Sequence, residues 1–162
     1  MVTSNWLFHL FTCKLYSMQE SCSDLNYFCA TALPVDCPVD IVFVLDGSGS
    51  IDATNFELAK SFLAHLVSRL DIDSSSTRVG LVTFSSSIGP SFNLNTYSTV
   101  ASVQAAILSL SYTPGGTNTA AALAYVRTTM LTSAAGDRGN VPNVVAVLTD
   151  GYSDDPADTQ VR

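Results

Sequence analysis

Small polar side chains follow two apolar segments of this sequence, at the point where each apolar run ends. Residues 39–45 lead into Asp46-Gly47-Ser48-Gly49-Ser50, and residues 143–148 lead into Thr149-Asp150-Gly151. In an open α/β sheet, ligands bind beyond the carboxyl ends of the strands where the strand order reverses. An Asp-Gly pair can instead form a hairpin turn, but a helical pattern follows Ser50, and this disfavours the hairpin. We therefore expect a binding site after these two runs.

Oxygen is the donor that these segments share. Asp46, Ser48 and Ser50 occupy alternate positions of a glycine-punctuated loop, which can curl so that a carboxylate and two hydroxyls face one centre. Asp150 and a hydroxyl from the loop at 115–119, Gly-Gly-Thr-Asn-Thr, would complete the set. Such ligands suit a small hard cation, so the pattern predicts a site for Mg²⁺ or Mn²⁺.

Other interpretations of these residues are simpler. Zinc is disfavoured, because neither His9 nor His65 lies near these loops. Ser48 and Ser50 could cap a helix or stabilise a loop, and Thr117 could be the N-cap of the next helix. The combination of the three segments makes the metal site the stronger hypothesis.

The elements that position these residues alternate between strands and helices. Period-2 and apolar runs predict strands at 39–45, 78–84, 88–94 and 143–148, with Gly89-Pro90 marking the third as an edge strand or bulge. Helical periodicity predicts helices from a capping box at Thr54–Glu57 to about Leu70, over 99–110, and over 119–131. The first helix should bury Phe56, Ala59, Phe62, Leu63, Leu66, Val67 and Leu70. This order predicts an α/β fold with a doubly wound, mostly parallel sheet and helices on both faces.

Composition limits the partners. The 162 residues carry a net charge of −7, which opposes binding to nucleic acid or anionic membranes, and no apolar run is long enough to span a bilayer. Residues 1–36 show no periodic order, so we place the domain at 37–162 and treat 1–36 as an extension. Its Cys13, Cys22, Cys29 and the neighbouring Cys37 fit no zinc pattern and could be disulfide-bonded or free. The apolar start at residues 6–11 is interrupted by His9 and makes an atypical secretory leader.

From Cys37 to Arg162 the sequence resembles the von Willebrand factor type A domain with its metal-ion-dependent adhesion site. Segment 40–51, Asp-Ile-Val-Phe-Val-Leu-Asp-Gly-Ser-Gly-Ser-Ile, is most similar to the matrix members, such as matrilins and non-fibrillar collagens. The resemblance implies that Ser48 and Ser50 bind the metal directly and that Thr117 does so in the ligand-competent state. Asp46 and Asp150 would act mostly through water.

The resemblance also implies a function. An acidic side chain of a collagen-like or other matrix partner would complete the metal's coordination shell, and the protein would be an extracellular adhesion module, not an enzyme. Two alternatives remain open: an intracellular assembly subunit, and a haloacid-dehalogenase-like phosphotransferase, which needs a second Asp where this chain has Ser48. The family's fold continues past Asp150 with two more helices and strands, so we expect a partial domain in which the outer edge of strand 144–148 is unpaired.

Overall fold

One five-stranded sheet organises the chain. A computed structural model describes residues 14–17, 38–151 and 153–154. The strands follow the order β1-β5-β2-β3-β4. The parallel centre consists of β2 (Val39–Asp46), β3 (Thr77–Phe84) and β5 (Asn143–Leu148), and the antiparallel edges are β1 (Lys14–Ser17) beside β5 and β4 (Ile88–Phe92) beside β3.

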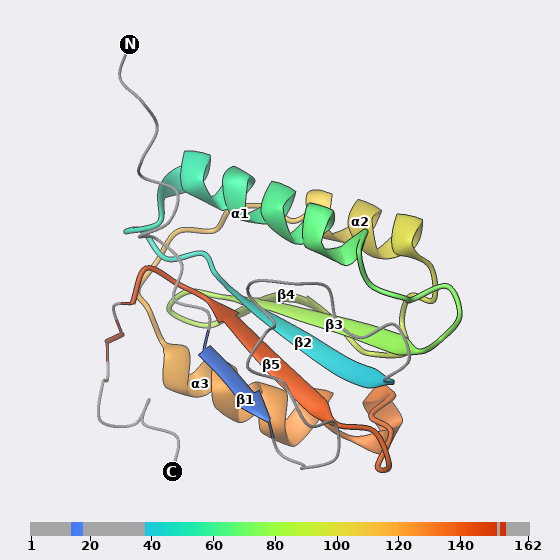
Figure 1. Cartoon of the computed structure of the whole chain (residues 1–162). Helices are drawn as coiled ribbons and strands as arrows, with labels where there is room; N and C mark the ends of the chain where they lie inside the picture. Colours follow the sequence, from blue (N-terminus) through green and yellow to red (C-terminus); the bar gives the residue numbers. More distant parts are fainter. Residues whose placement is uncertain (1–13, 18–37, 152, 155–162) are drawn as a thin grey trace.

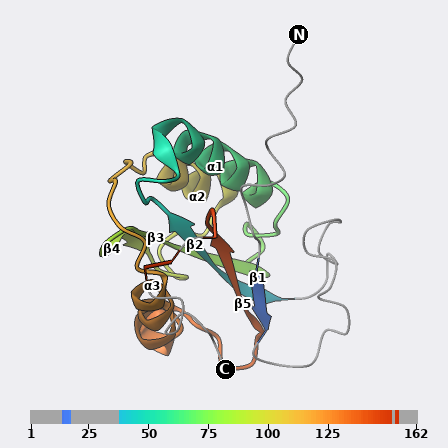
Figure 2. The same ribbon diagram turned by 90° about the vertical axis from the view of Figure 1, so that its left-hand side faces the viewer.

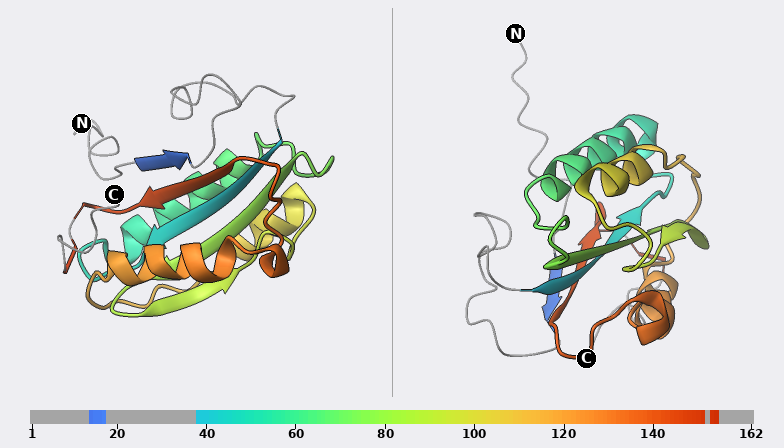
Figure 3. Two further views of the ribbon diagram at one scale, coloured as in Figure 1. Left: turned by 90° about the horizontal axis from the view of Figure 1, so that it is seen from below. Right: turned by 90° about the vertical axis from the view of Figure 1, so that its right-hand side faces the viewer.

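Helices cover both faces of this sheet. Helices α1 (Asp52–Val67) and α2 (Val100–Leu108) lie side by side on one face, and α3 (Thr119–Tyr125) lies on the other (Figures 1 and 2). A π-helical turn, Val126–Met130, continues α3, and a short 3-10 helix, Ser133–Ala135, follows it. The views from below and from the side show the same three layers (Figure 3). The predicted doubly wound α/β fold is confirmed.

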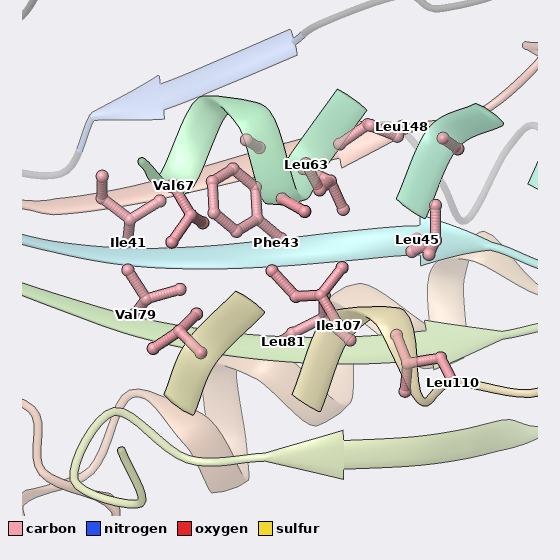
Figure 4. Packing of buried hydrophobic residues seen from close by; sticks show 14 of the residues in the cluster. Ile41, Phe43, Leu45, Leu63, Val67, Val79, Leu81, Ile107, Leu110 and Leu148 are labelled. Atoms are coloured by element: carbon pink, nitrogen blue, oxygen red, sulfur yellow. The ribbon is translucent and has the colours of Figure 1, made fainter. Parts of the chain in front are cut away.

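Alternate residues of β2 belong to two separate cores. Ile41, Phe43 and Leu45 pack beneath α1 and α2 with Leu63 and Val67 of α1 (Figure 4). The residues between them, such as Val42 and Val44, pack on the other face against the α3 side. Because the strand is buried on both faces, its sequence is a continuous apolar run rather than an alternating one.

Helix α1 differs from the prediction at both ends. It begins at Asp52, whose Oδ1 accepts the Asn55 amide N–H at 2.9 Å, so the capping box placed at Thr54 is wrong. Asp52 adopts a left-handed φ of 62°, which Asp tolerates better than most residues. The helix ends at Val67 instead of Leu70. Phe62 is 53% exposed, because it lies about 100° around the helix from Leu63 in the buried stripe.

Of the two predictions about the edges of the sheet, one is confirmed and one is wrong. Strand β4 is at the edge and its register with β3 shifts between Val82 and Phe84, as Gly89-Pro90 predicted. The outer edge of β5, however, pairs with β1, so the expectation of an unpaired edge there is wrong. A four-residue strand is too short to produce a recognisable period, which is why residues 1–36 gave no sign of it.

A buried ion pair fixes β5 against β2 at the amino ends of the strands. Asp40, fully buried, accepts hydrogen bonds from the Arg138 side chain at 2.6 and 2.9 Å and from its backbone N–H at 2.8 Å. Arg138 lies in the segment that leads into β5, while Asp40 is part of β2. This pair therefore helps to set the register of the two strands whose opposite ends carry Asp46 and Asp150.

The described helices include none that is long and apolar enough to cross a membrane. The four cysteines and His9 lie outside the described residues.

Candidate metal centre

The predicted site residues lie where the strand order reverses. From β2 the chain passes through α1 to β3 on one side, and later returns to place β5 on the other side of β2. The loops after β2 and β5 therefore leave adjacent parallel strands at the same edge of the sheet, beside the start of α1 (Figure 1). This is the position at which open α/β sheets bind ligands.

Asp46 is held by hydrogen bonds to both oxygens of its carboxylate. The residue is fully buried; Oδ1 accepts the Ser48 amide N–H at 2.8 Å, and Oδ2 accepts the Thr149 hydroxyl at 2.7 Å. Ser48 belongs to the loop after β2 and Thr149 to the loop after β5. One carboxylate thus joins the two loops, and the hairpin alternative at Asp46 is wrong.

The hydroxyls of Ser48 and Ser50 face each other. Their Oγ atoms are 3.1 Å apart, with Ser48 buried and Ser50 exposed. The Ser48 carbonyl accepts two hydrogen bonds, from the Tyr112 hydroxyl at 3.0 Å and from the Ile51 N–H at 3.2 Å. Neither serine caps α1, because Asp52 supplies the carboxylate there. Both hydroxyls are therefore placed together at the rim of the sheet, without a capping role.

The loop that carries Thr117 is joined to the serine loop by a backbone hydrogen bond. The Gly49 N–H donates to the Gly115 carbonyl at 2.9 Å, which joins this loop to the serine loop. Thr117 is buried and does not cap α3, because the Asn118 side chain accepts the Ala121 N–H at 3.0 Å. The alternative of Thr117 as an N-cap is wrong.

Asp150 follows β5 and lies close enough to Asp46 to influence it. The next residue, Gly151, has φ of 95°, a left-handed conformation that glycine adopts without strain, and donates its N–H to the Thr149 hydroxyl at 3.1 Å. Burial raises the pKa of Asp46, and repulsion from Asp150 adds to this, while hydrogen bonds from Ser48 and Thr149 lower it. Two carboxylates in a partly desolvated place favour a cation between or beside them.

The structure thus brings the five predicted residues to one edge. Asp46, Ser48 and Ser50 share a loop, Asp150 joins them through Thr149, and Thr117 arrives on a loop bonded to Gly49. Sequence reasoning missed the supporting roles of Thr149, Tyr112 and Asp154. Thr149 had been noticed only as part of the Thr-Asp-Gly motif, and the other two belong to no pattern of residue types.

The chemistry of the candidate ligands indicates which metal ion would fit this site. Two carboxylates and three hydroxyls are hard oxygen donors, which suit Mg²⁺ or Mn²⁺ better than a soft cation. Within the described residues there is no group of three or more His, Cys, Asp and Glu side chains that could hold a metal. His65 lies exposed in the last turn of α1, at the end of that helix remote from the site. The residues present fit a hydroxyl-dominated site for a hard divalent cation.

Comparison with known proteins decides the family. The profile of the von Willebrand factor type A domain matches residues 40–162. The chain belongs to the von Willebrand factor type A family. It is 43% identical to the mouse (Mus musculus) collagen alpha-4(VI) chain over 120 residues, and 40% identical to human (Homo sapiens) matrilin-1 over 116 residues. These matches cover 73% and 72% of this chain, but 5% and 23% of the two relatives, so the chain spans only a small part of their length.

Solved structures agree with the assignment. The proximal thread matrix protein 1 of the mussel byssus matches with a TM-score of 0.70 and 26% identity, over 77% of this chain and 34% of that one. A second structure of the same mussel protein, with a zinc-occupied MIDAS motif, matches with a TM-score of 0.57 and 30% identity, over 67% of this chain and 28% of that one. This von Willebrand factor type A domain is therefore similar to domains of matrix proteins.

Proposed function

We propose that this domain is a divalent-cation-dependent adhesion module that binds an acidic side chain of an extracellular matrix protein. The observation that carries the proposal is that hydrogen bonds join the loops that bear Asp46, Ser48, Ser50, Thr117 and Asp150 at the switch point of the sheet. The cation, Mg²⁺ or Mn²⁺, would supply positive charge that attracts a carboxylate. The side chains of this domain would hold and orient that cation.

Each side chain has a distinct part in holding the cation. Ser48 and Ser50 offer hydroxyls that are already 3.1 Å apart, so few conformations are lost when both become ligands. Asp46 is anchored at both oxygens, which suits a residue that stabilises a cation through water. The phosphotransferase alternative gains no support, because a nucleophilic Asp in that family needs a second Asp where this chain has Ser48.

Electrostatics favours an acidic partner. Neutral hydroxyls in the inner shell would leave the cation most of its charge, whereas direct carboxylate ligands would cancel it. The protein carries a net charge of −7, so without a cation it repels acidic ligands. The cation is thus the feature that allows an acidic surface to bind an acidic group.

The relatives suggest where the partner lies. Collagen VI and matrilins are extracellular matrix proteins, and the mussel relative is a thread matrix protein by name. We therefore propose an extracellular location and a protein partner, with collagen-like chains as the first candidates.

Cation binding is tested by calorimetry on the full 162-residue chain. Titration with Mn²⁺ or Mg²⁺ should show one site; Ser48→Ala and Asp46→Ala should each weaken it by about tenfold or more, since each removes a group that stabilises the ion. Ser109→Ala is the matched control, because its exposed hydroxyl bonds only to the Ala106 carbonyl within α2. Zn²⁺ is included because the mussel relative holds zinc at its MIDAS. Unchanged isotherms for both site variants would refute the metal assignment.

Partner recognition is tested separately. A collagen-like triple-helical peptide containing Glu should bind in Mn²⁺ and be released by EDTA, and its Gln counterpart should not bind. Thr117→Ala should weaken peptide binding more than Mn²⁺ binding, because the resemblance assigns Thr117 to the ligand-competent state. Thr113→Ala, in the same loop but exposed, is the control. Binding of the Glu peptide in EDTA would place recognition on another surface.

A further inference from the structure

Asp154 is joined to Thr117 by two hydrogen bonds that run in opposite directions. The Thr117 N–H donates to the Asp154 carboxylate at 2.6 Å, and the Asp154 N–H donates to the Thr117 carbonyl at 3.0 Å. The first is a short, charge-assisted bond, of the stronger class found in proteins. Asp154 was not among the residues that the sequence pointed to.

Glycine at position 116 makes room for this contact. A Cβ placed on Gly116 would lie 2.6 Å from Asp154 Oδ2 and 3.2 Å from Ser86 Oγ. The carboxylate therefore lies directly against the backbone of the Thr117 loop. Any side chain at position 116 would push Asp154 away from the Thr117 amide.

The bond to Asp154 connects two of the proposed ligand loops. Three consecutive N–H groups hold the Thr117 loop: Gly116 donates to Ser86 Oγ at 2.7 Å, Thr117 to Asp154, and Asn118 to the Ser85 carbonyl at 2.8 Å. The outer two bonds lead to the segment between β3 and β4. The middle bond leads to the segment after β5, which also carries Asp150.

We propose that Asp154 is the positioning residue for Thr117 and that it fixes the position of the Thr117 loop relative to Asp150. This inference rests on the proposed function, since it concerns two of the proposed ligands. Asp154 acts through the Thr117 backbone: its carboxylate holds the amide, and the amide places the hydroxyl. Cation affinity should then depend on the hydrogen-bond acceptor at position 154, and less on its charge.

The first test needs no metal. In EDTA, the Thr117 amide of the full chain should exchange slowly with solvent and resonate downfield in a ¹H–¹⁵N spectrum, because a charged acceptor holds it. Asp154→Ala should accelerate this exchange by about tenfold or more, whereas Asp154→Asn, which keeps an oxygen acceptor, should retain most of the protection. Asp52→Asn is the charge-matched control: it removes an exposed carboxylate at the start of α1 and leaves the cap acceptor in place.

The second test measures position with Mn²⁺ as the probe. Paramagnetic broadening of the Thr117 methyl signal depends steeply on its distance from the ion. Asp154→Ala should reduce this broadening at saturating Mn²⁺ and weaken Mn²⁺ binding by about tenfold. Asp154→Asn should stay within about threefold of the parent chain. Gly116→Ala should also reduce the broadening, and in the double variant the two effects should be less than additive, because both changes disturb the contact with Asp154.

The outcomes separate this inference from the proposed function. If the parent chain binds no Mn²⁺, the proposed function fails, while the amide measurements still decide whether Asp154 holds Thr117. If Mn²⁺ binds and Asp154→Ala leaves the Thr117 amide and methyl signals unchanged, the positioning role is refuted. An Asp154→Asn variant that keeps the amide protected and loses Mn²⁺ as completely as Asp154→Ala would also refute it, because charge alone would then be responsible.

Discussion

Tyr112 supports the candidate site from outside the set of proposed ligands. Its hydroxyl donates to the Ser48 carbonyl at 3.0 Å, and its ring packs against Phe56 with centroids 5.4 Å apart. Phe56 is a buried residue of α1 and belongs to the core between α1 and the sheet. The serine loop is therefore tied to the hydrophobic core through one side chain, and this tie restricts the conformations that the loop adopts before a cation arrives.

Tyr112→Phe should keep the ring contact and lose the hydrogen bond. We expect a loss of about 1 kcal/mol in the free energy of unfolding, because a partly buried carbonyl loses one of its two donors. Mn²⁺ affinity should fall by about three- to tenfold, since the loop would be less well preorganised. Tyr97→Phe is the control: that ring also packs against the same core, edge-on to Phe92, but away from the site. Equal affinities for the two variants would show that the tie has no effect on the cation.

At this scale the sequence reveals ligands better than it reveals their supports. Ser48, Ser50 and Asp150 could be proposed because a metal site needs particular side-chain types at particular spacings. Tyr112 and Asp154 could not, because their partners are a backbone carbonyl and a backbone amide. Every residue has such groups, so no spacing in the sequence marks the ones that are used.

Lys60 links the two helices on one face of the sheet. Its ammonium group is almost fully buried, donates to the carbonyls of Leu108 and Leu110 at 3.1 and 2.8 Å, and forms an ion pair with Glu57 at 2.8 Å. The two carbonyls lie at and just beyond the end of α2, where backbone acceptors lack partners within the helix and a positive charge is favourable. Lys60 therefore caps α2 from a position within α1.

Lys60→Met should leave the stem of the side chain in place and remove the donor. We expect the free energy of unfolding to fall by about 1–3 kcal/mol, because two carbonyls near the helix end would lose their donor. Glu57→Gln should cost less than about 0.5 kcal/mol, since Glu57 is exposed and surface ion pairs are weak. Urea denaturation of the three chains measures both values. A larger loss for Glu57→Gln than for Lys60→Met would contradict this division of roles.

The elements themselves were largely predictable, and the exceptions have physical causes. The strand at 143–148 has the predicted bounds, and α2 lies within the predicted 99–110, from Val100 to Leu108. Helix α1 begins two residues earlier than predicted. The sequence offers two possible caps, Thr54 and Asp52, and in the structure it is the Asp52 carboxylate that accepts the Asn55 amide N–H. The end of α3 opens into a π-helical turn at 126–130, which apolar periodicity does not distinguish from a regular helix.

The charge of the whole molecule bears on the proposed binding of an acidic partner. Asp46 ends β2, Asp52 begins α1, and Asp150 and Asp154 follow β5, while the net charge of the chain is −7. Two of the basic side chains, Lys60 and Arg138, are engaged in ion pairs with Glu57 and Asp40. Long-range electrostatics thus opposes the approach of an acidic partner, and the proposed short-range contact at the cation would have to overcome this repulsion.

This opposition predicts an unusual dependence on salt. The Debye length falls from about 30 Å at 0.01 M to about 8 Å at 0.15 M ionic strength, so added KCl should screen the long-range repulsion more than the contact at the cation. With Mn²⁺ present, the association rate constant of a negatively charged, Glu-containing collagen-like peptide should rise by about two- to threefold over this range. The dissociation rate constant should change less, because it depends on the short-range contact. Surface plasmon resonance measures both, with the same peptide in EDTA as the control. An association rate that falls steeply with salt would instead show that a basic surface attracts the peptide, and would contradict the proposed role of the cation.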